Sequence, residues 1–149
     1  MSEFYIKVKG VKEVEAYFNA LELRMEKAMA KVAGDSAKVI QKKARKEFRS
    51  RSGGRKDPPR PPRPTLRTGN LQKSILIDGP NRVGPASYSA KVGPTILYGR
   101  RVELGYEGGG GGRGQQTTRP FPYMGPALEK SRDEIISLYH EQVRKAVTG

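Results

Sequence analysis

The chain has 149 residues, 35% of them hydrophobic, so it can bury one modest core but not two independent ones. Its 29 Lys and Arg against 15 Asp and Glu leave a net charge of +14, which predicts a polyanion or an acidic protein surface as partner. The absence of cysteine excludes disulfides and thiolate metal sites and indicates an intracellular origin. No secretory leader and no long apolar run is present, so we expect neither secretion nor membrane spanning.

Two apolar patterns open the chain. The alternation of Phe4, Ile6 and Val8 with their neighbours predicts a short strand that Gly10 ends. From Val11 the period becomes helical for about 35 residues, and only Gly34 interrupts it, so we expect one long helix or two helices bent near Gly34. The apolar stripe of this helix comprises Val14, Phe18, Leu21, Met25, Met29, Val32, Ser36, Val39 or Ile40, and Ala44.

A basic arm follows the helix. Residues 49–67 contain five prolines and the pair Gly53-Gly54, which exclude regular structure and predict an extended segment that can reach a neighbouring subunit. From Lys42 to Arg67, eleven Lys or Arg stand against two acidic residues, a surplus of +9. The arm either contacts DNA or a protein partner, or is a solvated tail. Its candidate contact residues are Arg49, Arg51, Arg55, Lys56, Arg60, Arg63 and Arg67.

Beyond the arm, residues 71–77 and 82–92 are predicted to form two antiparallel strands joined by a turn at residues 78–81, with Gly84-Pro85 as a break. Residues 95–104 fit a short helix or a strand equally well. The glycines between Gly108 and Gly114 predict a flexible loop over residues 107–118.

The chain is predicted to end in an amphipathic helix with Pro126 in its first turn. Its apolar stripe comprises Leu128, Ile135, Leu138 or Tyr139, and Val143. The sequence as a whole predicts one α+β domain over residues 1–149, in which a long N-terminal helix and a C-terminal helix pack on a small antiparallel sheet.

Few residues have the chemistry that catalysis or metal binding needs. The single histidine, His140, lies in a helix and is expected to be solvated or at the edge of the core. The glycine-rich loop lacks the Lys-Ser or Lys-Thr of a phosphate-binding loop. We therefore predict no enzymatic activity, no metal and no cofactor, with a hydrolase as a remote alternative.

Three short motifs follow the arm in a fixed order. The first begins at Thr68-Gly69, which can turn the chain and cap a short helical turn that directs Leu71 and Ile75 to the core. The second lies around Glu103, and the third links Phe121 to the last helix. The motif positions are Thr68, Gly69, Leu71, Ser74, Ile75, Val102, Glu103, Gly105, Arg119, Pro120, Phe121, Pro126, Ala127 and Leu128.

Together with the preceding long helix, these motifs resemble the gp10-like family of phage HK97, over roughly residues 11–147. The resemblance implies a structural virion protein of a long-tailed bacteriophage: a neck, tail-completion or tail-terminator protein that forms a ring at the head–tail junction around the DNA channel. A hexamer is favoured, with a dodecamer as the alternative.

The partners that the resemblance implies are other copies of the chain, an adjacent connector or stopper protein, and a tail tube or tail terminator protein. Genomic DNA in the channel is a further partner, assembly would occur in the host cytoplasm, and no membrane is involved. Two segments depart from the family pattern: the arm over residues 49–64 is longer and more basic than the usual short link, and the glycine-rich loop over residues 108–114 is an elaboration. A non-specific DNA-binding protein that uses the basic arm is the rival interpretation.

Overall fold

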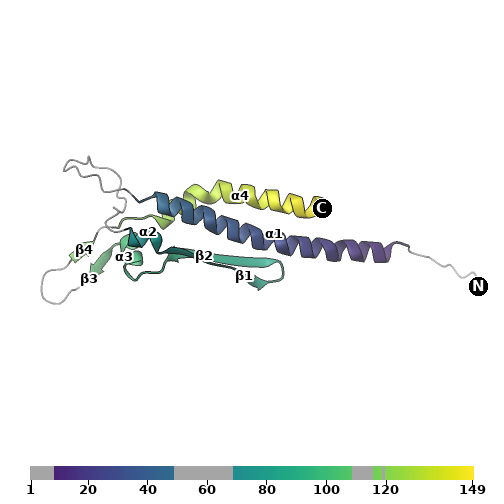
Figure 1. Ribbon diagram of the computed structural model, residues 1–149, viewed down its shortest axis with the longest axis horizontal. Helices are drawn as coiled ribbons and strands as arrows, with labels where there is room; N and C mark the ends of the chain where they lie inside the picture. The colour runs from purple at the N-terminus through teal and green to yellow at the C-terminus, as the bar shows by residue number, and fades with distance from the viewer. Residues whose placement is uncertain (1–8, 49–68, 109–115, 119) are drawn as a thin grey trace, which may run out of the picture.

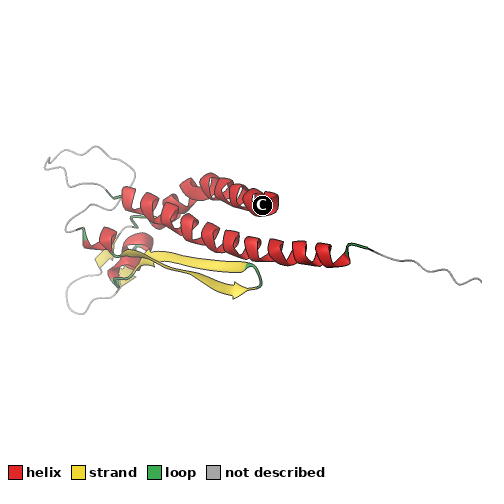
Figure 2. Cartoon of the chain, turned by 45° about the vertical axis from the view of Figure 1, so that its right-hand side comes forward, coloured by secondary structure: helices red, strands yellow, loops and turns green. Residues whose placement is uncertain are grey.

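The computed structural model describes residues 9–48, 69–108, 116–118 and 120–149. The fold is α+β, with a long N-terminal helix and a C-terminal helix packed against a two-stranded antiparallel sheet (Figure 1). This confirms the fold class predicted from the sequence. Helix α1 (Val11–Lys46) forms the middle layer, with α4 (Met124–Thr148) on one side and the hairpin of β1 (Ile75–Gly84) and β2 (Ser87–Pro94) on the other (Figure 2).

Helix α1 is one uninterrupted element of 36 residues, so the single long helix is the correct one of the two predicted forms. At about 1.5 Å per residue it is roughly 54 Å long. Its last turn contains Lys43, Arg45 and Lys46, whose positive charges interact favourably with the negative end of the helix dipole. The predicted strand at residues 4–8 and the arm at residues 49–67 lie outside the described residues.

The buried faces of α1 and α4 consist mainly of small side chains. These residues are Ala28, Ala37 and Ala44 in α1, and Ala127, Ser131, Gln142 and Ala146 in α4. Ala28 and Ala37 are nine residues apart and so lie on opposite sides of α1, as expected of a helix with another layer on each side. The apolar stripes predicted for both helices are partly wrong, because the fully buried residues outside them are mostly small ones such as Ala37 and Ala127, while larger stripe residues are partly or largely exposed. Leu128 is 55% exposed, since α4 turns Ala127 and Ser131 toward the interior instead.

The first turns of α1 also depart from the prediction. Val14 and Phe18 were expected to face the core but are 53% and 59% exposed. The physical reason is that α1 extends past the ends of α4 and of the hairpin, so no other layer covers this part of the helix (Figure 1).

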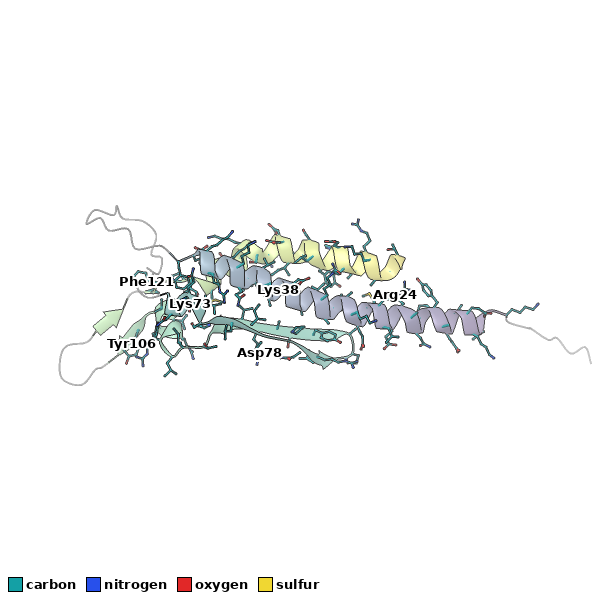
Figure 3. The ribbon with its side chains drawn as sticks, in the orientation of Figure 1. Arg24, Lys38, Lys73, Asp78, Tyr106 and Phe121 are labelled. Carbon is teal, nitrogen blue, oxygen red and sulfur yellow. The ribbon has the colours of Figure 1, made fainter. Side chains whose placement is uncertain are left out.

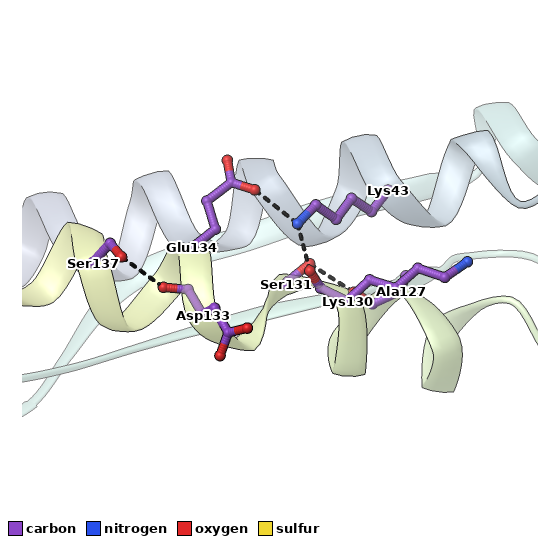
Figure 4. Close-up of polar contacts among 7 residues, drawn as sticks. All are labelled: Lys43, Ala127, Lys130, Ser131, Asp133, Glu134 and Ser137. Carbon is purple, nitrogen blue, oxygen red and sulfur yellow. Dashed lines mark hydrogen bonds and ion pairs between the residues drawn. The ribbon is translucent and has the colours of Figure 1, made fainter.

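Polar contacts close the edge between α1 and α4 (Figure 4). The Nζ atom of Lys43 lies 2.7 Å from Oε2 of Glu134 and donates to the carbonyl oxygen of Lys130 at 2.6 Å. Lys130 in turn forms an ion pair with Glu47, which is buried. These long side chains therefore link the C-terminal end of α1 to the first turns of α4.

The hairpin is antiparallel as predicted, but its turn is elsewhere. Asp78 pairs with Lys91 and Asn81 with Ser89, so residues 78–81 stay in β1 and contain a bulge with one extra residue. The chain reverses at Pro85-Ala86, between the paired residues 84 and 87. The prediction failed because a bulge and a turn both use a residue with positive φ, which Gly79 supplies at 109°.

Three short elements complete the fold. Residues 71–73, predicted as strand, belong to α2 (Asn70–Lys73), the short helical turn expected from the first motif. Residues 95–104, for which the sequence allowed two assignments, contain α3 (Tyr98–Leu104). β3 (Tyr106–Gly108) pairs antiparallel with β4 (Gln116–Thr118), so both ends of the predicted flexible loop are strands, and residues 109–115 lie outside the described residues.

Candidate functional site

The residues of the three sequence motifs converge at one end of the molecule. The C-terminal end of α1, α2, α3 and the start of α4 meet there, around a cluster that we call the motif hub. The hub consists of Ala44, Phe48, Ile75, Tyr123 and Ala127, with Leu71, Val92, Val102 and Met124 packed against them. Figure 3 labels Lys73 and Phe121 at this end and Arg24 toward the other.

Tyr123 is the largest fully buried side chain of the hub. Its ring centroid lies 4.9 Å from that of Phe48, and its hydroxyl donates to the carbonyl oxygen of Gly99 at 3.2 Å. Burial raises the pKa of the Tyr123 hydroxyl to about 12, and the nearby carboxylate of Glu103 adds to this increase. The hydroxyl is therefore a neutral donor at physiological pH.

Glu103 joins the second motif to the start of α4. Its Oε2 atom accepts the backbone N–H groups of Tyr123 at 2.7 Å and Met124 at 3.0 Å, and its Oε1 atom accepts that of Gly125 at 2.9 Å. The first N–H groups of a helix have no partner inside the helix, and a negative charge there is favourable. Glu103 thus caps α4 from a distant part of the sequence.

The second and third motifs are also joined through the backbone. The N–H of Phe121 donates to the carbonyl oxygen of Val102 at 2.8 Å. Gly105 ends α3 with a φ of 77°, a conformation that favours glycine. Helix α3 can therefore end directly after Val102 and Glu103, the residues that bond to Phe121 and to the start of α4.

The first motif is tied to α1 by side chains of that helix. The carbonyl oxygen of Ile75 accepts Nε2 of Gln41 at 2.7 Å and Nη2 of Arg45 at 2.9 Å. Gln72 donates from Nε2 to the carbonyl oxygen of Arg45 at 2.7 Å. Within the motif, Ser74 donates to the carbonyl oxygen of Leu71 at 2.7 Å. These bonds fix the junction of α2 and β1 on the C-terminal end of α1.

The predicted site residues thus divide into three groups. Gly69, Leu71, Ser74, Ile75, Val102, Glu103, Gly105, Phe121, Pro126 and Ala127 lie in or beside the motif hub. Pro120 and Leu128 are described but exposed. The residues that lie outside the described ranges are Thr68, Arg119 and the arm residues Arg49, Arg51, Arg55, Lys56, Arg60, Arg63 and Arg67.

Sequence reasoning missed Tyr123, Gln41 and Arg45. Tyr123 stands next to the third motif, but nothing local distinguishes it from tyrosines that are exposed, such as Tyr98 and Tyr139. Gln41 and Arg45 lie on a helix rich in polar residues, where their long-range bonds to Ile75 have no sequence signature.

Glu103, Gln41, Arg45 and Gln72 all bond to backbone atoms at the hub, which is the arrangement of a scaffold. One further group, Nε of Arg45, is buried without a hydrogen-bond partner. Within residues 9–48, 69–108, 116–118 and 120–149, no three His, Cys, Asp or Glu side chains are grouped so that they could hold a metal ion. His140 is exposed, and its ring packs edge-on against Tyr139. In the same part of the chain, no helix has the length and apolarity needed to cross a lipid bilayer.

No protein-family model, no curated protein and no solved structure matches this chain. The likeness of its motifs to the phage family therefore stays a prediction from the sequence.

Proposed function

We propose that this chain is a structural, ring-forming subunit at the head–tail junction of a tailed bacteriophage. It would join the head connector to the tail tube around the DNA channel, as a neck, tail-completion or tail-terminator protein. The observation that carries the proposal is the motif hub. Glu103 and Phe121 bond the second and third motifs to each other, and Ile75 of the first motif, which is bonded to α1, packs in the same apolar cluster.

The use of the polar groups in the hub supports a structural role. Glu103, Gln41, Arg45 and Gln72 all form hydrogen bonds with backbone atoms. A catalytic site instead needs titratable side chains directed at a space where substrate can bind. The motifs would thus fix the helices and the hairpin relative to one another in a rigid subunit. The function of that subunit would be to assemble with other proteins of the particle.

The charge of the chain suggests which surfaces meet its partners. Two cations of the last turns of α1, Lys43 and Arg45, are engaged with Glu134 and Ile75. Most of the +9 surplus between residues 42 and 67 belongs to the arm. In a ring, this charge would face DNA in the channel or an acidic connector, stopper or tail protein, since copies of equal charge repel one another.

A particle-assembly experiment tests the proposal. A nonsense mutation in the gene should yield filled heads and free tails that do not join, and the purified chain should restore joined particles in an extract. Labelled chain should then be imaged at the junction. Joined, infectious particles made without the chain would refute the proposal.

The local surplus of +9 also favours a second function, non-specific DNA binding by the arm. Deleting residues 49–64 separates the two functions. A DNA-binding protein would lose its affinity for duplex DNA, which would also fall steeply with salt in the intact chain. A junction protein would keep its fold and its ring, and would mainly lose docking to a neighbouring protein.

A further inference from the structure

The N-terminal part of α1 projects beyond the rest of the described fold (Figure 1). Helix α4 ends beside Arg24, because a Cβ atom built on Gly149 would lie 3.1 Å from Nη1 of Arg24. Near the end of the hairpin, Arg82 forms an ion pair with Glu26. Residues 11–23 therefore extend past both neighbouring layers, by roughly 20 Å at 1.5 Å per residue.

One face of this projecting segment combines apolar and acidic side chains. Val11, Glu15, Phe18 and Glu22 follow one another at intervals of four, three and four residues, which places them on the same side of the helix. All four are exposed, and neither glutamate has an ion pair within the described part of the chain. We call these residues the acidic face. Segment 11–23 carries Lys12 against Glu13, Glu15 and Glu22, a net charge of 1 − 3 = −2 in a chain of +14.

The opposite end of the molecule carries the complementary pattern. Leu97, Arg100, Arg101 and Leu104 also lie on one side of a helix, at α3, and we call them the basic face. Leu97 is 97% and Leu104 64% exposed, and both arginines are exposed as well. In the described ranges neither arginine has an ion pair, and the guanidinium of Arg101 lies 4.6 Å from the centroid of the Tyr106 ring.

We infer that the acidic face of one copy docks on the basic face of the next copy. The two faces match in composition, because each has two apolar residues that exclude water from the contact. Each also has two charged residues, negative on one face and positive on the other, and these set the register of the contact. Because they lie at opposite ends of one chain, each copy can use both at once. The contact is heterologous, and such a contact closes a ring when the rotation between copies allows it.

This inference rests on the proposed function in one respect, since it identifies the contact between neighbouring subunits of the ring. It also explains how copies with a net charge of +14 associate: each contact pairs two glutamates with two arginines. The contact should weaken as salt rises, because these charges lie at a solvent-accessible surface.

Charge reversal at each face tests the contact. The first variant reverses the acidic face, with Glu15→Lys and Glu22→Lys, and the second reverses the basic face, with Arg100→Glu and Arg101→Glu. A third variant carries all four changes. The control reverses two charges at exposed positions of α4, with Glu129→Lys and Arg132→Glu. We expect sedimentation velocity to show association weakened by at least about tenfold for either pair alone. The four changes together should restore it to within about threefold, and the control should leave it unchanged.

Circular dichroism of every variant shows whether the fold is kept. Two results would overturn the inference in the folded variants: association that neither single pair weakens, or association that the four changes together fail to restore. A wild-type chain that stays monomeric at every concentration would also overturn it.

Cysteine cross-linking gives a second, independent measurement, because the chain contains no cysteine of its own. Phe18→Cys combined with Leu97→Cys should produce a ladder of disulfide-linked copies on oxidation, since the two positions lie at opposite ends of one molecule. Phe18→Cys with Ile136→Cys, also exposed, is the control. Equal linking in the control, or no linking of the first pair, would contradict the docking.

The same cross-link applied to assembled particles separates this inference from the proposed function. A chain found at the head–tail junction without the Phe18–Leu97 link would refute the docking but leave the function intact. Linked copies of a chain that is absent from particles would refute the function and support the docking.

Discussion

Gly34 of α1 and Pro80 of β1 face each other where the helix crosses the bulge of the hairpin. A Cβ atom built on Gly34 would lie 3.5 Å from Cδ and 3.7 Å from Cγ of the proline, which is ordinary van der Waals contact. The glycine is therefore not required by the packing, and the hairpin has room for a methyl group at this point of the helix.

Alanine at two glycines should have opposite effects. Gly34→Ala should stabilise the chain by about 0.5–1 kcal/mol, because glycine costs that much inside a helix. Gly79→Ala should destabilise it by more than about 1 kcal/mol, since Gly79 has a φ of 109° and its Cβ would lie 2.8 Å from the carbonyl oxygen of Ser89. Urea denaturation measures both changes in the free energy of unfolding. Equal signs would contradict the packing described for this interface.

Removal of the cap on α4 should destabilise the fold. Glu103→Ala leaves the N–H groups of Tyr123, Met124 and Gly125 without their acceptor and should cost about 2 kcal/mol of unfolding free energy. Glu103→Gln, which keeps one acceptor oxygen but no charge, should cost less. Glu129→Ala, which changes an exposed acidic residue of α4, is the control and should change stability by less than about 0.5 kcal/mol. A Glu103→Ala variant as stable as this control would argue against the cap.

The small buried residues of α1 should not tolerate enlargement. Ala44 has no exposed surface and lies in the motif hub, so Ala44→Leu should cost roughly 1–3 kcal/mol through overpacking. Ala16→Leu, the same change at an exposed position of the same helix, should be nearly neutral because both residues have high helix propensity. Thermal unfolding followed by circular dichroism compares the two, and similar midpoints would mean that Ala44 is not tightly packed.

Stability should fall at alkaline pH because of Tyr123. Burial raises the pKa of this hydroxyl from its ordinary value of 10.0 to about 12, so the unfolded chain loses the proton at lower pH than the folded chain. The contribution is complete below pH 10 and is lost as pH rises toward 12, by an amount on the order of 2 kcal/mol. Denaturant unfolding across this range should show a steeper loss for the wild type than for Tyr123→Phe. Parallel curves would indicate an accessible hydroxyl.

The helices were predictable because their apolar periodicity is local. The burial of individual side chains was not, since it depends on where the other layers end. Phe18 has the same spacing as core residues of α1, yet it lies past the end of α4 and is exposed. Leu128 is more apolar than Ala127, but α4 turns Ala127 into the motif hub and leaves Leu128 exposed.

The candidate site was predictable only in part, because its motifs are local sequence patterns whereas the residues that bond to them are distant in the chain. The motifs around Ile75, Glu103 and Phe121 stood out in the sequence, and the structure brings them together. Their partners are distant in the chain, as Gln41 is from Ile75 by 34 residues, so no spacing rule links them. The prediction of a turn at residues 78–81 was wrong because Asp, Gly, Pro and Asn also suit a bulge within a strand.

Helix α1 is a continuous, rigid spacer between the two ends of the molecule. A single helix runs from Val11 at the acidic face to Lys46 beside the motif hub, with no intervening loop that could take up slack. The distance between the two ends of the molecule is therefore set by the number of residues in that helix. Inserting or deleting one turn would change this distance by about 5.4 Å and, in the proposed ring, would change the spacing between neighbouring copies by a similar amount.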